Sequence, residues 1–446
     1  MKQLKNSFKN YADVTRNILA FTFFTLTFIT SSTAQVEDVK RITKQLCSPS
    51  FHGRGYVNGG DSIAADYLIQ EFQNAGLMGV SGSYFQRFSF PVNTYPAKAN
   101  FTKGGTALSI GTDILPHAES PSFNDTLRYK IVKARDIFDA EKIVSHLQQA
   151  MTGEIANSIA IDYTGLSKDS LKLVKNFQYE LAQFIPVIVL TDEKMIWSVG
   201  RKQLAFPIFE LKKDLADGSE IIVQLDAVFK ENHVARNVYG YAPALKNSKK
   251  TIVVCAHYDH LGRLGQDNYF PGANDNASGT AMMLSLAKHY KLNPAKYNML
   301  FIAFAGEEAG ILGSKYFVEN PPIPLHEIAF VINLDILGSG EDGITVVNGS
   351  IFPKHFDVLK QINEEKKLLK TVNSRGYAAN SDHYWFSDAG IPSFFLYTMG
   401  PNKHYHDPED LYEKLSFAEV NDIHTLLQNF VTAITTKKIK EAKEKK

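Results

Sequence analysis

Histidine and acidic residues recur directly after strand-like segments in the second half of the chain. His257 and Asp259 follow an apolar run at residues 251–255, and Asp275 lies in a turn rich in Gly and Asn before a helical pattern. Glu307 and Glu308 follow a second apolar run, and Asp335 follows a third. His404, Tyr405 and His406 lie in the loop after a fourth run. Imidazole and carboxylate groups without thiolates are ligands that zinc and similar ions use in catalytic sites. The residue types therefore predict a catalytic metal centre.

Each of these features also has an ordinary structural explanation. A histidine near an aspartate is often a buried pair, adjacent glutamates often belong to a solvated helix face, and an aspartate in a turn often caps a helix. Their shared position favours the functional interpretation, because the carboxyl ends of parallel strands form one edge of a sheet and bind ligands there. We therefore expect residues that are far apart in the sequence to converge in space.

The charges of the candidate ligands favour two metal ions. Two divalent cations bring four positive charges, and Asp275, Glu308 and Asp335 bring three negative charges. A bridging hydroxide would supply the fourth negative charge. Since one cation among three carboxylates would leave an excess of negative charge, the sequence predicts a dinuclear centre.

The apolar runs that precede these residues predict the fold class. Continuous apolar segments at 251–255, 299–304, 330–334 and 393–397 are typical of strands buried on both faces. Helical patterns lie between them, for example at 279–290 and 352–368, and an earlier helix and strand are predicted at 63–72 and 86–92. This alternation predicts an α/β fold with a mostly parallel twisted sheet flanked by helices.

Residues 97–232 have a different character from the segments on either side. Short β-like runs at 158–161, 185–190 and 221–225 alternate with helical stretches such as 139–149, and no tight cluster of histidines and acids occurs. We interpret this block as an inserted smaller domain, α/β or β-rich. The catalytic domain is then built from residues 35–96 and 233–436.

The composition indicates a globular protein with a large core. The chain has 446 residues, of which 44% are hydrophobic, and its 48 basic and 47 acidic residues leave a net charge of +1. This balance gives no indication of nucleic-acid binding. Two cysteines exclude a disulfide scaffold and a cysteine-built metal site.

Residues 1–34 have the pattern of a signal peptide. Basic residues precede an apolar stretch at 18–29, and the small residues Ser32 and Ala34 suit cleavage after Ala34. An uncleaved anchor is the alternative, but this stretch is short of the roughly 20 residues that a spanning helix needs. We therefore expect an exported protein, periplasmic or extracellular, without a stable membrane anchor after cleavage. At the other end, residues 437–446 form a basic tail that we expect to be solvated.

Five strings around the candidate ligands carry a specific family resemblance. They occur in the order AHYDHLG, PGANDNASG, FAGEEAGILGS, INLDILG and HYHDPEDL, between residues 256 and 411. Together they resemble the dizinc aminopeptidase family that includes aminopeptidase Y and the small secreted bacterial aminopeptidases. The resemblance covers most of residues 40–430, and the 97–232 block is similar in position to a protease-associated domain.

The resemblance implies a role for each candidate residue. Asp275 would bridge two zinc ions, with His257 and Asp335 completing one metal site and Glu308 and His406 the other. Three further residues would have catalytic roles. Glu307 would be the general base, Asp259 would orient His257, and Tyr405 would steady the oxyanion. The family also holds the turn at Asp275 with a cis peptide bond.

Several alternatives remain open from the sequence. His260 and His404 lie beside assigned ligands, and residues 381–383 resemble a family segment near the substrate pocket, which we interpret as pocket wall. The predicted function is a secreted zinc aminopeptidase that acts on peptides. A carboxypeptidase or dipeptidase on the same scaffold, a single-zinc glutaminyl cyclase, and a binding protein without catalysis are the alternatives. A carboxypeptidase would need a fixed cation for the terminal carboxylate, and the five strings contain no arginine. The oligomeric state is not indicated.

Overall fold

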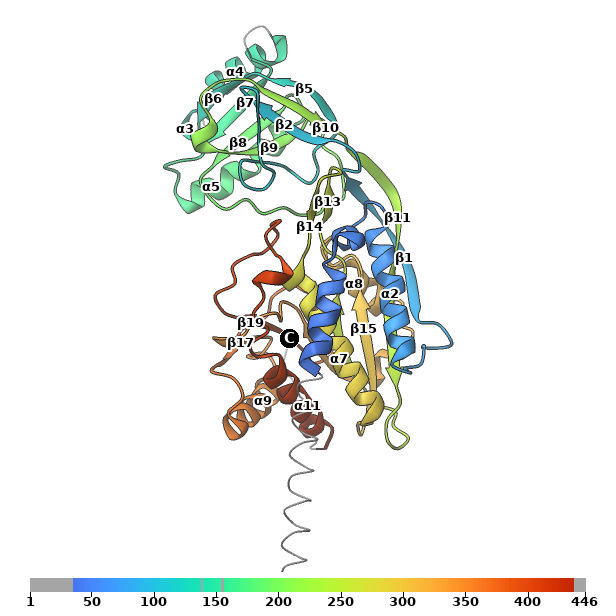
Figure 1. The fold of residues 1–446 in the computed structure, drawn as a ribbon. Helices are drawn as coiled ribbons and strands as arrows, with labels where there is room; N and C mark the ends of the chain where they lie inside the picture. The colour runs from blue at the N-terminus through green and yellow to red at the C-terminus, as the bar shows by residue number, and fades with distance from the viewer. Residues whose placement is uncertain (1–34, 138, 154–155, 437–446) are drawn as a thin grey trace, which may run out of the picture.

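The computed structural model describes residues 35–137, 139–153 and 156–436. The predicted signal peptide, 1–34, and the basic tail, 437–446, lie outside the described residues. The chain forms a larger body around an eight-stranded sheet and a second part that sits at one end of it (Figure 1). No helix within the described ranges is both long and apolar enough to cross a membrane.

The large sheet confirms the predicted α/β class. Its four central strands, β15, β12, β16 and β19, are mutually parallel, and antiparallel strands flank them on both sides. In spatial order the strands are β1 (Phe85–Thr94), β11 (Val228–Ala242), β15 (Asn298–Phe304), β12 (Thr251–His257), β16 (Ile328–Leu334), β19 (Ser393–Met399), β17 (Gly343–Val347) and β18 (Val372–Ser374).

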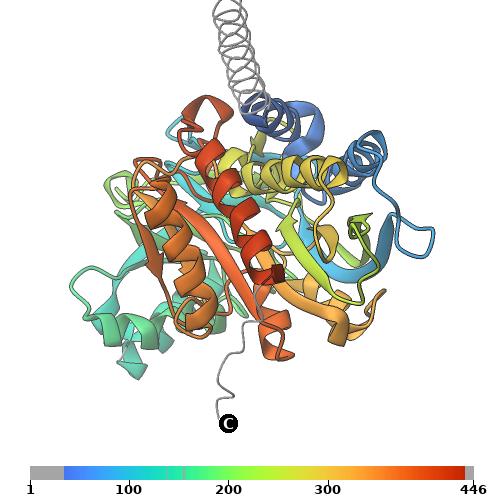
Figure 2. The same cartoon turned by 90° about the horizontal axis from the view of Figure 1, so that it is seen from below.

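Helices cover both faces of this sheet, which explains the continuous apolar runs. Ile252 and Val254 of β12 pack into the core beneath one helical layer, while Val253 and Cys255 pack into a separate core on the opposite face. Figure 2 shows three helices of the first layer side by side, α9 in orange, α11 in red and α7 in yellow. The first layer comprises α2 (Gly60–Asn74), α7 (Gly279–Leu292), α9 (Pro353–Lys366) and α11 (Val420–Thr436), and the second α8 (Leu312–Glu319) and α10 (His383–Asp388).

Two smaller sheets form the second part, and all their strands come from residues 99–225. The antiparallel sheet contains β3 (Thr106–Ala107), β2 (Ala99–Lys103), β10 (Ile221–Leu225) and β5 (Phe123–Leu127). The mixed sheet contains β4 (Ile114–Pro116), β9 (Ile208–Lys212), β8 (Val187–Thr191), β7 (Ser158–Asp162) and β6 (Tyr129–Lys133), and helices such as α4 (Ala140–Thr152) flank it. The paired strands β1 and β11 run from the body toward this part (Figure 1). We call it the insert.

A fully buried arginine ties the N-terminal segment to the loops that follow β12. Arg54 ends the short helix η1 (Pro49–Arg54), and its guanidinium donates hydrogen bonds to backbone carbonyls only. The carbonyl acceptors, at 2.7–3.1 Å, belong to Leu46, Tyr258, Pro271 and Gly272. Because Pro271 and Gly272 begin the turn that contains Asp275, and the Asp275 carbonyl also accepts from Arg54 at 3.4 Å, Arg54 fixes the path of that turn.

We expect Arg54→Leu to lower the free energy of unfolding by about 3–5 kcal/mol. The substitution leaves several buried carbonyls without a donor, and each unsatisfied group costs about 1–3 kcal/mol. Urea unfolding followed by fluorescence measures the change. The matched control is Arg87→Leu, at an exposed arginine on β1, for which we expect a change within about 0.5 kcal/mol. Equal effects of the two substitutions would contradict this role of Arg54.

Candidate functional site

Five of the predicted ligands meet at the carboxyl edge of the large sheet. His257 ends β12, and its Nε2 lies 3.4 Å from Asp275 Oδ1 and 3.3 Å from Asp335 Oδ1. On the other side, His406 Nε2 lies 3.1 Å from both Asp275 Oδ2 and Glu308 Oε2. Asp275 therefore directs one carboxylate oxygen toward each of two groups of candidate metal ligands, His257 with Asp335 and His406 with Glu308.

The turn that carries Asp275 is held by hydrogen bonds to its backbone. The carboxylate of Asp410 accepts the backbone N–H groups of Asn274 and Asp275 at 3.0–3.1 Å. Asn276 Oδ1 accepts the backbone N–H of Gly279, the first residue of α7, at 3.0 Å. The Asp275–Asn276 peptide bond is cis, as the family resemblance implies. The position of the shared carboxylate is thus fixed from both sides of the turn.

The electrostatics of the site favour bound cations. Burial opposes a proton on His406, but the carboxylates of Glu308 and Asp275 outweigh it and raise the pKa of His406 to about 11. Burial likewise opposes a proton on His257, but Asp335 and other acids raise its pKa well above the ordinary value. The site therefore draws positive charge onto its histidines.

The donor set also fits a divalent metal ion. Asp335 Oδ1 is buried without a hydrogen-bond partner among the described residues, although it points at His257. In each of two residue groups the candidate ligand atoms lie within 4.8 Å of one another: His257, Asp275 and Asp335, and His260, Asp275 and Glu308. The predicted ligand His406 is in neither group, and His260 takes its place, although His406 Nε2 lies 3.1 Å from both Asp275 and Glu308. Buried carboxylates without partners are costly, and coordination to a metal ion removes that cost. Two metal positions that share Asp275 fit these residues.

The pKa values of the two adjacent glutamates are shifted in opposite directions. Burial and the nearby carboxylates of Glu308 and Asp382 raise the pKa of Glu307 well above its usual range. Burial also acts on Glu308, but the charge of His406 outweighs it and lowers the pKa of Glu308 to about 2. Glu307 is in neither of the two ligand groups. One carboxyl group can therefore carry a proton while its neighbour stays ionised as a ligand.

Asp259 touches both halves of the site. Its backbone carbonyl lies 3.1 Å from His257 Nδ1, whereas its carboxylate is 3.9 Å from that nitrogen. The carboxylate instead accepts the hydroxyl of Tyr56 at 2.7 Å and the backbone N–H groups of Glu307 and Glu308 at 3.2 and 3.3 Å. Asp259 thus orients His257 through its main chain and positions the glutamate pair through its side chain.

The alternative residues occupy distinct places. His260 Nδ1 lies 2.8 Å from Glu308 Oε1, so two histidines contact this glutamate. His404 lies outside both ligand groups and faces Asp407 instead, at 3.4 Å. Ser381, predicted as pocket wall, donates to Asp335 Oδ2 at 2.8 Å. Hence Ser381 orients a candidate ligand directly.

Tyr405 stacks on the ring of His406. The two ring centroids are 3.9 Å apart, at an interplanar angle of 14°, and the tyrosine is 42% exposed. Burial of its hydroxyl and the charge of Asp275 raise the pKa of Tyr405 above its usual value. Its hydroxyl therefore stays protonated at neutral pH and can donate a hydrogen bond.

Hydrogen bonds and an ion pair from the insert hold the loop that carries His406. These contacts were not predicted from the sequence. The backbone carbonyl of Trp197 lies 2.8 Å from His406 Nδ1, and the Trp197 N–H donates to the His406 carbonyl at 3.1 Å. Lys194 pairs with Asp407 and donates to the Tyr405 carbonyl at 3.2 Å. No sequence signal marks these contacts, since any residue can supply a backbone carbonyl.

Comparisons with known proteins find similarity to peptidases. The model of Peptidase family M28 matches residues 237–431. Aminopeptidase YwaD of Bacillus subtilis is 27% identical over 366 residues, which cover 77% of this chain and 74% of that protein. A probable leucine aminopeptidase of Trichophyton verrucosum is 32% identical over 193 residues, 41% of this chain and 54% of its own length.

Solved structures support the fold over nearly the whole chain. BSAP, a zinc aminopeptidase from Bacillus subtilis, superposes with a TM-score of 0.65 at 20% identity, over 92% of this chain and 96% of that one. The aminopeptidase from Aneurinibacillus sp. strain AM-1 gives a TM-score of 0.61 at 20% identity, over 89% and 93%. The two-part architecture is therefore shared with these proteins.

We expect Lys194→Met to weaken metal binding and lower turnover, each by roughly tenfold, because groups that orient metal ligands typically contribute at least that much. The substitution removes the ion pair to Asp407 and frees the loop on both sides of His406. Metal titration and kcat measurements check the result. The matched control is Lys103→Met, which removes a 2.8 Å ion pair to Asp217 elsewhere in the insert. Unchanged metal affinity in Lys194→Met would contradict the role of this loop.

Proposed function

We propose that this chain is an exopeptidase of peptidase family M28, whose model matches residues 237–431, and that it uses two zinc ions to remove N-terminal residues from peptides. The family match and the aminopeptidase relatives support a metallo-aminopeptidase, a hydrolase of peptide bonds. The observation that carries the two-metal proposal is Asp275. Its two oxygens face separate groups of donors, His257 with Asp335 and His406 with Glu308.

The protein's own residues divide the work of hydrolysis. Zinc ions held by these five ligands would polarise the scissile carbonyl and lower the pKa of a nearby water. Glu307 takes a proton from the attacking water as its oxygen bonds to the carbonyl carbon. Glu307 then returns the proton to the leaving amine as the C–N bond breaks, which leaves the carboxyl group unchanged. Burial and the neighbouring carboxylates raise the pKa of Glu307, and bound cations would oppose that shift and leave its carboxylate free to accept the proton.

Further groups can bind the substrate on either side of the scissile carbonyl carbon, at its oxygen and at its free α-amine. The hydroxyl of Tyr405, next to His406, is a donor for the oxygen that becomes negative during attack. The carboxylates of Glu307 and Asp335 are the candidates for holding the free α-amine of the substrate. A single-zinc cyclase would leave one of the two donor groups unused, which favours the peptidase.

Two substitutions separate a metal ligand from the general base. We expect the wild-type protein to bind two zinc ions per chain and Asp275→Ala to lose metal. Glu307→Gln should keep both ions and lose turnover by about 10²–10⁴, the usual contribution of a positioned acid–base group. Metal content by mass spectrometry and kcat on a leucyl anilide check these results.

Glu308→Gln is the matched control for Glu307→Gln, since it changes the adjacent carboxylate. If Glu307→Gln loses metal and Glu308→Gln retains it, the roles of the pair are reversed. Full activity of the wild-type protein with one ion per chain would contradict the dinuclear site.

A decapeptide without acidic side chains tests the direction of cleavage. Acetylating its N-terminus should nearly abolish hydrolysis, because the neutral amide loses both its charge and a hydrogen-bond donor at Glu307 and Asp335. Amidating its C-terminus should change the rate little, since that end lies far from the metal centre. Product analysis by mass spectrometry distinguishes the outcomes. The reverse pattern would indicate a carboxypeptidase and leave the metal site intact.

A further inference from the structure

A cleft opens beside the predicted metal ligand Glu308, between the body and the insert. Its volume is about 630 Å³, within the range of small-molecule sites. Pro91, Glu308, Ala309 and Gly310 line it from the body, and Glu119, Val199, Arg201 and Lys202 line it from the insert.

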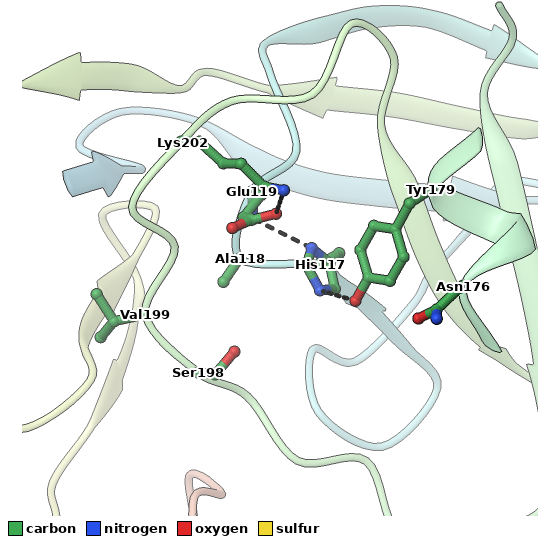
Figure 3. A pocket seen from close by; sticks show the side chains of 8 residues that line it. All are labelled: His117, Ala118, Glu119, Asn176, Tyr179, Ser198, Val199 and Lys202. Carbon is green, nitrogen blue, oxygen red and sulfur yellow. Dashed lines mark hydrogen bonds and ion pairs between the residues drawn. The ribbon is translucent and has the colours of Figure 1, made fainter. Parts of the chain in front are cut away.

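A second cavity continues into the insert and shares three of these lining residues. Its volume is about 520 Å³. Figure 3 shows the ring of Tyr179 and the carboxylate of Glu119 on one side of this cavity and Ser198 and Val199 on the other. The shared residues are Glu119, Val199 and Lys202. Hence the two cavities provide binding space from the loop of Glu308 into the insert.

The position of the cleft indicates which part of a peptide it would receive. This inference rests on the proposed function, in which Asp335 and Glu307 hold the α-amine. Glu308 lines the cleft and Asp335 does not. A peptide whose amine is anchored at Asp335 and that runs past Glu308 would place its residues beyond the scissile bond in the cleft.

One arginine that lines the cleft carries a charge that no neighbouring side chain offsets, among the residues that the structure describes. Lys202 lies 3.6 Å from the carboxylate of Glu119, so these two charges offset each other. His117 is neutral, because burial and the charge of Lys202 lower its pKa to about 4. Arg201 has no hydrogen-bond or ion-pair partner among the described residues.

Arg201 also lies close to the loop of the glutamate pair. A Cβ atom on Gly310 would be 3.7 Å from the Arg201 Cζ and Nη2 atoms, so the guanidinium rests against the backbone two residues after Glu308. These distances are ordinary van der Waals contact, so the guanidinium packs beside this loop at the mouth of the cleft.

We propose that this cleft binds the part of the peptide that follows the scissile bond and that Arg201 selects substrates with a carboxylate there. A guanidinium pairs with a carboxylate through two parallel hydrogen bonds, which no neutral amide can match. The carboxylate belongs either to the C-terminus of a short peptide or to an acidic side chain. The inserted domain would then contribute to substrate choice.

Two pairs of matched substrates test this proposal and separate the two sources. The first pair is Leu-Gly-Gly with a free or an amidated C-terminus. The second pair is Leu-Asp-Gly amide and Leu-Asn-Gly amide. We expect the wild-type protein to prefer the carboxylate in at least one pair by roughly tenfold in kcat/KM, a modest effect because Arg201 is exposed. A preference in the first pair alone identifies the C-terminus, and a preference in the second alone identifies the side chain.

Arg201→Gln should reduce that preference to near unity, mainly through KM. Arg135→Gln, at an exposed arginine of the insert outside both cavities, is the matched control and should keep the preference. Two results would overturn the inference. One is a kcat/KM ratio near one for both substrate pairs in the wild-type protein, and the other is a preference that Arg201→Gln leaves unchanged. Leucinamide, which lacks a carboxylate, separates the two hypotheses. If leucinamide is cleaved while the ratios are near one, only the role of Arg201 is wrong, whereas failure to cleave any N-terminal residue overturns the proposed function as well.

Discussion

The burial of negative charge at one edge of the sheet is the constraint on which the rest of the site depends. Five aspartates there are at most 6% exposed: Asp259, Asp275, Asp335, Asp382 and Asp410. Transferring ionised carboxylates from water into a protein interior is costly unless each one is paired, hydrogen-bonded or bound to a metal. Arg54 does not relieve this cost through ion pairs, because its guanidinium donates to carbonyls. Cations held among these carboxylates would therefore stabilise the fold as well as support the chemistry.

The protein distributes the remaining charge by giving each carboxyl group a different environment. Asp410 accepts two backbone N–H groups, yet burial dominates and raises its pKa to about 7. Burial also raises the pKa of Asp259 to about 6, although Tyr56 and two backbone N–H groups donate to it. The ligands face imidazoles instead, as the low pKa of Glu308 beside His406 illustrates. Asp259 and Asp410, which position the loops, can thus hold a proton, while Asp275 and Glu308 stay ionised.

Sequence patterns predicted the four central strands and the edge strand β1, but not β11, β17 and β18. The run at 251–255 is apolar at every position because β12 is covered on both faces, and such a run is recognisable locally. The direction of β11 and β17 depends on how distant segments pair, so the antiparallel flanks carried no local signal. Similarly, residue type alone could not separate His260 from His406, since both contact Glu308. Arg54 gave no sign of its burial, because its partners are main-chain atoms in segments up to 218 positions away.

The insert contributes to the candidate site because one of its loops contacts that site at two points. Trp197 holds His406 from outside the body, and Arg201, four residues later, faces the cleft beside Glu308. The ring of Trp197 stacks on Phe270 at a centroid distance of 4.7 Å, which anchors this loop to the segment that leads into the Asp275 turn. A displacement of the insert about the β1–β11 pair would consequently move the residue that orients His406 and a wall of the cleft together. Binding of a peptide in the cleft would therefore be coupled, through a single short segment, to the geometry of the candidate metal ligands.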